Sequence, residues 1–116
     1  MKEAIVHSDT TVTIREAPIP TPGRNEVLIK VMVFGLNPKD WKIPAWQNAS
    51  MNSGDDVAGF VEAVGEDVIG FRKGDCVAGF HVITGPGGTF AEYALVPSHT
   101  AFCIPRSVSF EEVCST

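Results

Sequence analysis

The 116-residue chain has no hydrophobic run long enough to cross a membrane, since none approaches the roughly 18 apolar residues that a spanning helix needs. Its N-terminus also lacks the apolar core of a secretion signal, and the sequence therefore predicts a soluble, cytoplasmic protein. Cysteine is scarce: Cys76, Cys103 and Cys114 are widely spaced and form no C-x-x-C pair. This spacing argues against a disulfide framework or a zinc cage, and we expect reduced, mostly buried thiols.

Positive charge is also scarce, with nine Lys and Arg against fourteen Asp and Glu, a net charge of −5 and a pI near 5.0. Such a balance disfavours nucleic acid or an anionic membrane as the main partner. The sequence also lacks the nucleophile motif G-x-S-x-G, the phosphate loop G-x-x-x-x-G-K and the dinucleotide loop G-x-G-x-x-G. Residues 85–88, Gly-Pro-Gly-Gly, do not replace that last loop, because proline interrupts the glycines and no helix is expected to follow.

What the sequence does contain is a glycine-punctuated run over residues 54–80, GDDVAGFVEAVGEDVIGFRKGDCVAGF. Turns are expected at Gly65–Asp67 and Lys73–Asp75, and a bulge or a close approach at Gly79, because glycine adopts positive φ without steric cost. The apolar stretches between the glycines have the length of short strands. These stretches are Val57–Val64, Val68–Phe71 and Cys76–Phe80. The run therefore predicts a curled, barrel-like sheet.

The rest of the chain adds strand signals and little helix, so the expected fold class is mainly β, a partly open barrel with short helical turns. The strongest strand signal is EVLIKVMVF over Glu26–Phe34, in which the odd-numbered aliphatic residues share one face. A short helix is expected near Lys39–Ile43, followed by a polar loop over Pro44–Ser53. The other expected strands are Ala4–His7, Val12–Arg15, Thr89–Val96 and Thr100–Ile104.

A polar segment follows the strongest strand and is the main candidate for chemistry. Asn37-Pro38-Lys39-Asp40-Trp41-Lys42 places an amide, two ammonium groups, a carboxylate and an indole within six residues. Such groups can hydrogen-bond a nicotinamide, pair with phosphate and stack on a ring, and loops after strands commonly carry function. The spacing alone favours a simpler interpretation, in which Asn37 caps the short helix, the charged side chains face water and Trp41 plugs the end of the barrel.

Three other features are weaker candidates. Asp55-Asp56, before a strand, could bind metal or act in acid–base chemistry, but paired carboxylates are more often a turn signal. His81 and His99 are separated by a whole strand, and neither lies near a cysteine at metal-ligand spacing, so packing or surface roles are expected. Tyr93, the only tyrosine, alternates with apolar residues and is expected in the sheet.

Several motifs occur in order: IKVMVFGLNPKDWK, then the glycine-punctuated run, then GGTFAEYALVP and IPRSVSFEE. In this combination, from Ala4 to Glu112, the chain resembles the N-terminal GroES-like (chaperonin-10-like) catalytic domain of the medium-chain dehydrogenase/reductase superfamily. Where zinc enzymes of this superfamily carry a cysteine, this chain has Asn37, and where they carry His-Glu it has Asp55-Asp56. The chain thus resembles the zinc-independent branch of quinone reductases and enoyl reductases. Its LNPKDWK is especially similar to the trans-acting enoyl reductases of fungal polyketide pathways.

The resemblance implies an NADPH-dependent reductase without zinc, which acts on a small-molecule enone, enoyl or quinone substrate. In such relatives hydride passes from NADPH to the β-carbon of an activated double bond, and the α-carbon is then protonated. The resemblance does not identify the proton donor. The resemblance implies that Asn37 lies near the nicotinamide as the catalytic residue. It also implies that the cofactor is contacted by Lys39, Asp40, Trp41 and Lys42. Lys and Asn donors would then polarise the carbonyl in place of zinc.

The domain organisation expected from the resemblance is one GroES-like domain over residues 1–116, with the Rossmann cofactor domain missing from this chain. Ser109–Glu112 has the S-x-x-E pattern of a helix start, which leads into the cofactor domain in the relatives. We therefore expect a truncated piece of a reductase that is inactive alone and that dimerises or aggregates through an uncovered apolar face. Two alternatives stay open: a stand-alone barrel that acts as a binding or scaffold module, and a ring-forming subunit like a chaperonin.

Overall fold

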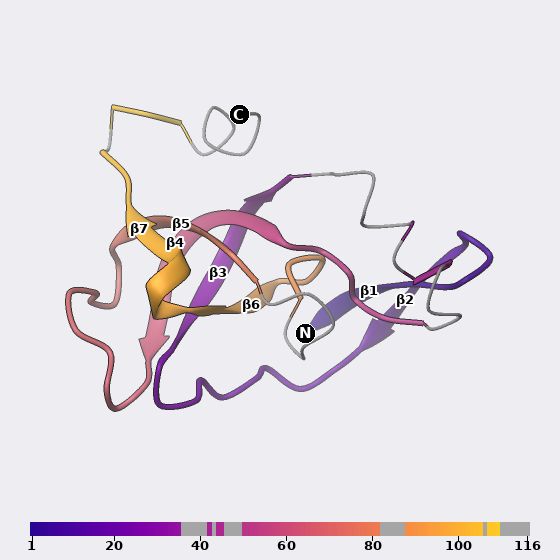
Figure 1. The fold of residues 1–116 in the computed structure, drawn as a ribbon, viewed down its shortest axis with the longest axis horizontal. Helices are drawn as coiled ribbons and strands as arrows, with labels where there is room; N and C mark the ends of the chain where they lie inside the picture. Colours follow the sequence, from indigo (N-terminus) through magenta and orange to yellow (C-terminus); the bar gives the residue numbers. More distant parts are fainter. Residues whose placement is uncertain (36–41, 43, 46–49, 82–87, 106, 110–116) are drawn as a thin grey trace.

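The computed structural model describes residues 1–35, 42, 44–45, 50–81, 88–105 and 107–109 (Figure 1). Within this part strands predominate and helix is confined to short turns, which confirms the expected mainly β fold class. None of the helices described is long and apolar enough to span a membrane. The elements in chain order are β1 (Lys2–Val6), β2 (Val12–Glu16), β3 (Glu26–Phe34), β4 (Asp56–Val64), β5 (Cys76–Phe80), β6 (Tyr93–Pro97), the 3-10 turn η1 (Ser98–Thr100) and β7 (Ala101–Cys103).

The strands form two antiparallel sheets. β1 and β2 pair as a hairpin, and the other five strands follow the order β6–β3–β4–β5–β7. Figure 1 shows the hairpin at the right of the view and the five-stranded sheet curling at the left. Isolated bridges from Glu3 to Ala91 and from Val6 to Met51 attach β1 to the segments that precede β6 and β4. The larger sheet is the curled half-barrel that the glycine-punctuated run predicts.

One face of the five-stranded sheet carries the main hydrophobic core. This core consists of fully buried β-branched residues from four neighbouring strands, and such side chains pack well on a pleated surface. Val31 packs against the core, so the odd-numbered residues of β3 face it up to this point, as predicted. A bulge between Val31 and Val33 then shifts the register, places Val33 opposite Ala58 and ends the regular alternation. The core residues are Val27, Ile29, Val57, Val61, Val77 and Val96.

The larger sheet curls until β5 approaches β6, although β3 and β4 lie between them in the strand order. The ring nitrogen Nδ1 of His81, just after β5, lies 2.5 Å from the carbonyl oxygen of Leu95 in β6. At Gly79 the two strands are too close for a side chain, because a Cβ there would lie 2.8 Å from Cγ1 of Val96. The predicted close approach at Gly79 is therefore confirmed, and it allows the sheet to close on itself.

The loop between β4 and β5 confirms the predicted turns and corrects one predicted strand. Both turns occur, and Gly74 in the second of them has a φ of +95°. Val68–Phe71 is not a strand, because Gly70 within it has a φ of +92°, which interrupts an extended backbone. Its apolar ends still pack against the core. This stretch is therefore apolar because it is a loop that covers the core, and not because it is a strand.

Two further boundaries differ from the prediction. The strand expected over Thr89–Val96 begins only at Tyr93, because the preceding residues reach β1 through a single isolated bridge. Pro44 and Ala45 are helical and do not belong to the polar loop expected over Pro44–Ser53; proline is compatible with the first turn of a helix. The remaining predicted strands occur within one or two residues of their expected ends.

Candidate functional site

Three strands of the larger sheet meet at one edge, which we call the site edge (Phe34–Gly35, Asp55–Asp56 and Phe80–His81). β3 ends there, β4 begins there and β5 ends there, because the strands are antiparallel, and Asp56 lies opposite Phe80. The amide of Gly35 donates to the carbonyl oxygen of Asp56 at 3.1 Å. The site edge is therefore an ordered base, and in the sequence the polar segment LNPKDWK starts directly after it.

The carboxylate pair of the site edge does not form a turn, so the turn interpretation is wrong. Asp56 is the first residue of β4, and Asp55 before it has only 5% of its surface exposed. The carbonyl oxygen of Asp55 accepts a hydrogen bond from the amide of His81 at 2.8 Å, which continues the pairing of β4 with β5. One carboxylate is therefore buried and the other half-buried, on backbone that neighbouring strands hold in place.

Most of the predicted site residues lie outside the described part of the chain. These are Asn37, Lys39, Asp40 and Trp41. Lys42 is described: it is helical and half-buried, in agreement with the short helix expected near Lys39–Ile43. The cofactor and catalytic roles assigned to these residues stay predictions.

The histidines and the tyrosine occupy the places expected of packing and surface residues. His81 is buried, and because its Nδ1 lies next to a backbone carbonyl oxygen, Nδ1 carries the proton in the neutral ring. His99 lies exposed in η1. Tyr93 begins β6 opposite Lys30 of β3, within the sheet.

The cysteines do not form a site in the described part of the chain. Cys76 is half-buried and Cys103 is exposed, and both are free thiols. The expectation of mostly buried thiols is therefore wrong for Cys103, which lies on the edge strand β7. Among the residues described, no group of three or more His, Cys, Asp or Glu is placed to hold a metal ion.

Asn52 is a buried polar hub that the sequence did not reveal. Its amide nitrogen donates to the carbonyl oxygen of Gly88 at 2.9 Å and to a carboxylate oxygen of Glu3 at 3.1 Å. Its carbonyl oxygen accepts from the backbone amides of Phe90 at 3.1 Å and Gly54 at 3.3 Å. One side chain thus joins β1, the segment before β4 and the segment before β6. A single asparagine in a polar stretch carries no sequence signal for such a role.

Glu3 connects this hub to the hairpin. Its side chain is nearly excluded from water, and burying such a group costs free energy unless it is paired and hydrogen-bonded. Besides Asn52, it pairs with Arg15 of β2, whose Nη2 lies 2.9 Å from Oε1 of Glu3. This pair could have been predicted from the register of the hairpin, which places Glu3 directly opposite Arg15.

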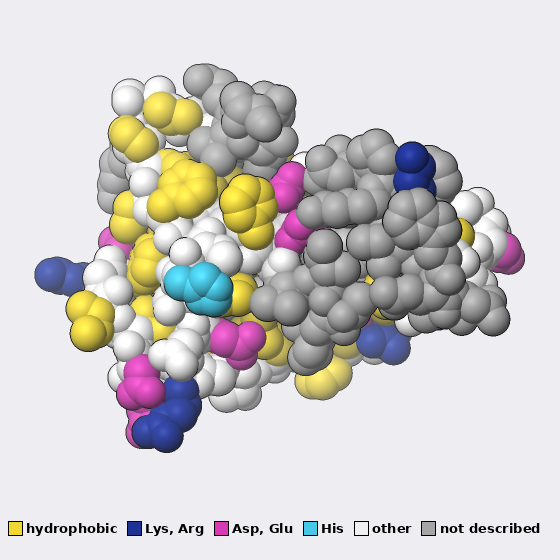
Figure 2. Space-filling model, viewed as in Figure 1, with side chains coloured by type: hydrophobic (Ala, Val, Ile, Leu, Met, Phe, Trp, Pro, Cys, Tyr) yellow, Lys and Arg dark blue, Asp and Glu magenta, His cyan; other side chains and the backbone are white. Residues whose placement is uncertain are grey.

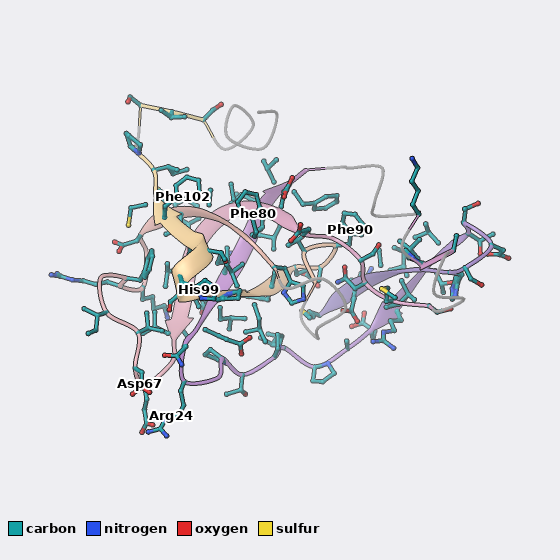
Figure 3. The ribbon with its side chains drawn as sticks, viewed as in Figure 1. Arg24, Asp67, Phe80, Phe90, His99 and Phe102 are labelled. Atoms are coloured by element: carbon teal, nitrogen blue, oxygen red, sulfur yellow. The ribbon has the colours of Figure 1, made fainter. Side chains whose placement is uncertain are left out.

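An apolar groove of about 720 Å³ lies between the hairpin and the end of β3. Among its lining residues, Phe34 of the site edge packs edge-on against Phe90, with ring centroids 5.0 Å apart (Phe90 is labelled in Figure 3). The hairpin contributes Val12 and Ile14, which are 58% and 63% exposed. The groove therefore connects the site edge with the exposed face of the hairpin.

A second apolar patch lies on the opposite side of the larger sheet from the main core. Phe102 of β7 lies opposite Ala78 of β5, and Phe80 stands two residues further along that strand, so the two rings share a face. They are 47% and 51% exposed; Figure 3 labels both near each other in this view, and Figure 2 shows hydrophobic side chains exposed over this part of the sheet. In the part of the chain that the structure describes, the groove and this Phe80–Phe102 patch are thus both exposed apolar surfaces.

Residues 23–106 match the family described as "Alcohol dehydrogenase GroES-like domain". The trans-enoyl reductase fsr4 of Gibberella fujikuroi is 44% identical over 114 residues, which cover 97% of this chain and 34% of that protein. A quinone oxidoreductase of Sus scrofa is 43% identical over 102 residues, which cover 84% of this chain and 30% of that protein. The crystal structure of an alcohol dehydrogenase superfamily protein from Novosphingobium aromaticivorans superposes with a TM-score of 0.83 at 31% identity, over 95% of this chain and 36% of that one.

The chain spans about a third of the length of these curated relatives. The family match includes β3 to β7 and the site edge, which are the parts that carry the expected motifs. The same half-barrel occurs in the solved structure, so sequence and fold agree. The chain therefore belongs to the alcohol dehydrogenase GroES-like domain family of the medium-chain dehydrogenase/reductase superfamily, among relatives that are enoyl and quinone oxidoreductases.

Proposed function

We propose that this chain is the catalytic-domain portion of an NADPH-dependent oxidoreductase that reduces an activated carbon–carbon double bond or a quinone without zinc. The family supports an oxidoreductase role. The observation that supports the finer proposal is the site edge, where Asp55–Asp56 and the end of β3 lie together on ordered backbone. The segment LNPKDWK, with its amide and ammonium groups, begins directly after this edge in the sequence.

In the proposal Asn37 contacts the substrate carbonyl or the nicotinamide, and Lys39, Asp40, Trp41 and Lys42 bind the cofactor. NADPH supplies the hydride when it is bound. The described residues fit only one side of such a site, because they include no glycine-rich strand–turn–helix unit that would hold a pyrophosphate. We therefore expect the isolated 116-residue chain to show no NADPH-dependent turnover.

Zinc independence rests on the residue types at the site edge and after it. Zinc sites in proteins are built mainly from cysteine and histidine, whereas this chain offers Asn37 and Asp55-Asp56 at the corresponding positions. A hydrogen-bond donor aimed at a developing oxyanion can replace a Lewis acid. The proposal therefore assigns the polarisation of the carbonyl to Asn37 and a neighbouring lysine.

The test is a chimera in which this chain replaces the matching segment of the trans-enoyl reductase from Gibberella fujikuroi. We expect the chimera, but not the isolated chain, to oxidise NADPH with an enone or a quinone, and a strong chelator to leave the rate unchanged. In the chimera Asn37→Ala should lower kcat about 10²-fold, as loss of an oxyanion donor does. Lys73→Ala, on an exposed loop beside Glu62, is the matched surface control and should have no effect.

Each part of the proposal fails on a different outcome. Turnover by the isolated chain contradicts the assignment as a portion of an enzyme. Loss of chimera activity on chelation, restored by zinc, contradicts zinc independence. An unchanged kcat in Asn37→Ala removes the catalytic role of Asn37 and leaves the rest of the proposal standing.

A further inference from the structure

The outward edge of β2 has no backbone partner in the part of the chain that the structure describes. Met1 and Ala17, at the ends of the hairpin, exchange hydrogen bonds of 2.7 and 2.8 Å, and the register continues with Glu3 opposite Arg15. In antiparallel pairs such mutually bonded residues alternate with residues whose backbone groups point away. The outward-pointing residues of β2 are therefore the even-numbered ones, Val12, Ile14 and Glu16.

β1 shows the same alternation, and its outward-pointing backbone groups form hydrogen bonds with other segments of the chain. The amide of Ala4 donates to the carbonyl oxygen of Phe90 at 2.7 Å, and the amide of Val6 donates to that of Met51 at 2.7 Å. β1 is thus an interior strand with neighbours on both sides, and β2 is the edge strand.

The β2 edge is also apolar and lacks most of the devices that protect edge strands. Its sequence, VTIRE, contains no proline, lysine or bulge, and every residue of it is exposed. Val12 and Ile14 leave more than half of their surface in water. Arg15, the only cation on the strand, is paired with Glu3 of the same chain. An unpaired edge with exposed apolar residues is a template for another strand.

We propose that this edge pairs with β2 of a second copy of the chain, antiparallel and with Ile14 opposite Ile14. The alternation requires that outward-pointing residues face each other, because only they can exchange hydrogen bonds, and the Ile14-centred register is the one that pairs all three of them. A two-fold axis at Ile14 places Val12 of one copy opposite Glu16 of the other, so every outward residue of both strands obtains a partner. A homodimer with this isologous interface is self-complementary.

Charge and area set the expected strength of this dimer. In the Ile14-centred register Glu16 lies opposite a valine and Arg15 lies opposite Thr13, so no like charges face each other directly. Pairing of five-residue strands buries less than the roughly 1,200 Å² of a standard interface. We therefore expect a weak dimer, with a dissociation constant on the order of 10–100 μM.

The first experiment is analytical ultracentrifugation over a wide concentration range, with circular dichroism as the folding check. The chain should shift from monomer to dimer, and Ile14→Lys should stay monomeric with an unchanged spectrum. Phe102→Lys is the matched control: it places the same charge on the Phe80–Phe102 patch and should leave the dimer intact.

A chain that stays monomeric at all concentrations overturns the proposal, and the edge is then available to an extended segment of another polypeptide. Dissociation by Phe102→Lys but not by Ile14→Lys overturns it in favour of the Phe80–Phe102 patch.

The second experiment tests the register by cross-linking in a background with all three native cysteines replaced by serine. With oxidised glutathione as the oxidant, Ile14→Cys should form a disulfide-linked dimer, since the two thiols lie opposite each other. Glu16→Cys alone should not cross-link, but an equal mixture of Glu16→Cys and Val12→Cys should. Rapid cross-linking of Glu16→Cys with itself, or none for Ile14→Cys, contradicts the Ile14-centred register.

Discussion

The two sheets of this molecule contain similar residues and use them in opposite ways. Ile29, in the middle of the five-stranded sheet, is fully buried, whereas Ile14, in the middle of β2, is 63% exposed. Both belong to antiparallel strands rich in β-branched residues, so strand propensity does not separate them. The number of neighbouring strands does separate them. β3 has a strand on each side and a core on one face, whereas β2 pairs only with β1 among the residues that the structure describes. The larger sheet therefore contributes most of the buried core that stabilises the fold, whereas the side chains of β2 are exposed to water.

The largest expected effect compares these two isoleucines directly. Ile29→Ala should lower the free energy of unfolding by about 2–5 kcal/mol, because it removes a buried side chain and leaves a cavity in the core. Ile14→Ala should change it by less than about 0.5 kcal/mol, because the side chain is mostly in water already. Urea denaturation at low protein concentration, where the proposed dimer is dissociated, measures both.

Equal losses for the two variants would show that the hairpin carries as much stability as the larger sheet. A control for the chemistry of the substitution is Ile69→Ala, in the loop between β4 and β5. Ile69 is 91% exposed, so its replacement should match Ile14→Ala and not Ile29→Ala.

Much of the strand arrangement could be predicted from local sequence. The alternation in β3 correctly assigned Val27, Ile29 and Val31 to one face, and Gly79 correctly marked a close approach. Burial was harder to predict, because it depends on partners that are distant in sequence. The apolar run Val68–Phe71 looks like a strand but is a loop over the core. The sequence of β2 does not reveal that, in the described part of the chain, this strand has β1 as its only neighbour.

The next effect concerns the connection between the two sheets. Asn52→Ala removes the amide that joins Glu3 of the hairpin to Gly88 and Phe90 near the larger sheet. It leaves buried backbone groups unpaired, and we expect a loss of about 1–3 kcal/mol of unfolding free energy. Hydrogen exchange should show faster exchange in β1 while β3 and β4 stay protected. Thr89→Val, which removes a buried hydroxyl with no hydrogen-bond partner among the described residues, is the buried control and should leave β1 protected. Uniform acceleration in both sheets would contradict a local role for Asn52.

For the candidate site, the sequence predicts short motifs, whereas the backbone that holds the site edge depends on contacts between segments that are distant in the sequence. LNPKDWK and Asp55-Asp56 are recognisable as short sequences, because their chemistry lies in residue types at close spacing. The burial of Asp55 is set by the pairing of β4 with β5, which lie apart in the chain. Asn52 and Glu3 act through contacts across 49 positions of sequence, and no local pattern encodes such contacts.

The smallest expected effect is a pH dependence confined to the hairpin. In the turn of the hairpin the hydroxyl of Thr11 donates to Oδ1 of Asp9 at 2.6 Å, and this bond, together with the Thr11 amide, holds the pKa of Asp9 below its ordinary value of 3.8. A carboxyl whose pKa is lowered on folding stabilises the folded state above its unfolded pKa, and this contribution is lost as the pH falls through the folded value. NMR titration should therefore show loosening of the hairpin below about pH 4.

Thr11→Val should raise the pKa of Asp9 toward 3.8. The control is Asp67→Asn, which removes an exposed partner of Arg24 beside the larger sheet (Figure 3) and should leave the titration of the hairpin unchanged. An unaltered Asp9 titration in Thr11→Val would mean that the hydroxyl does not set this pKa, and the hairpin would then have no acid-sensitive feature of its own at this turn.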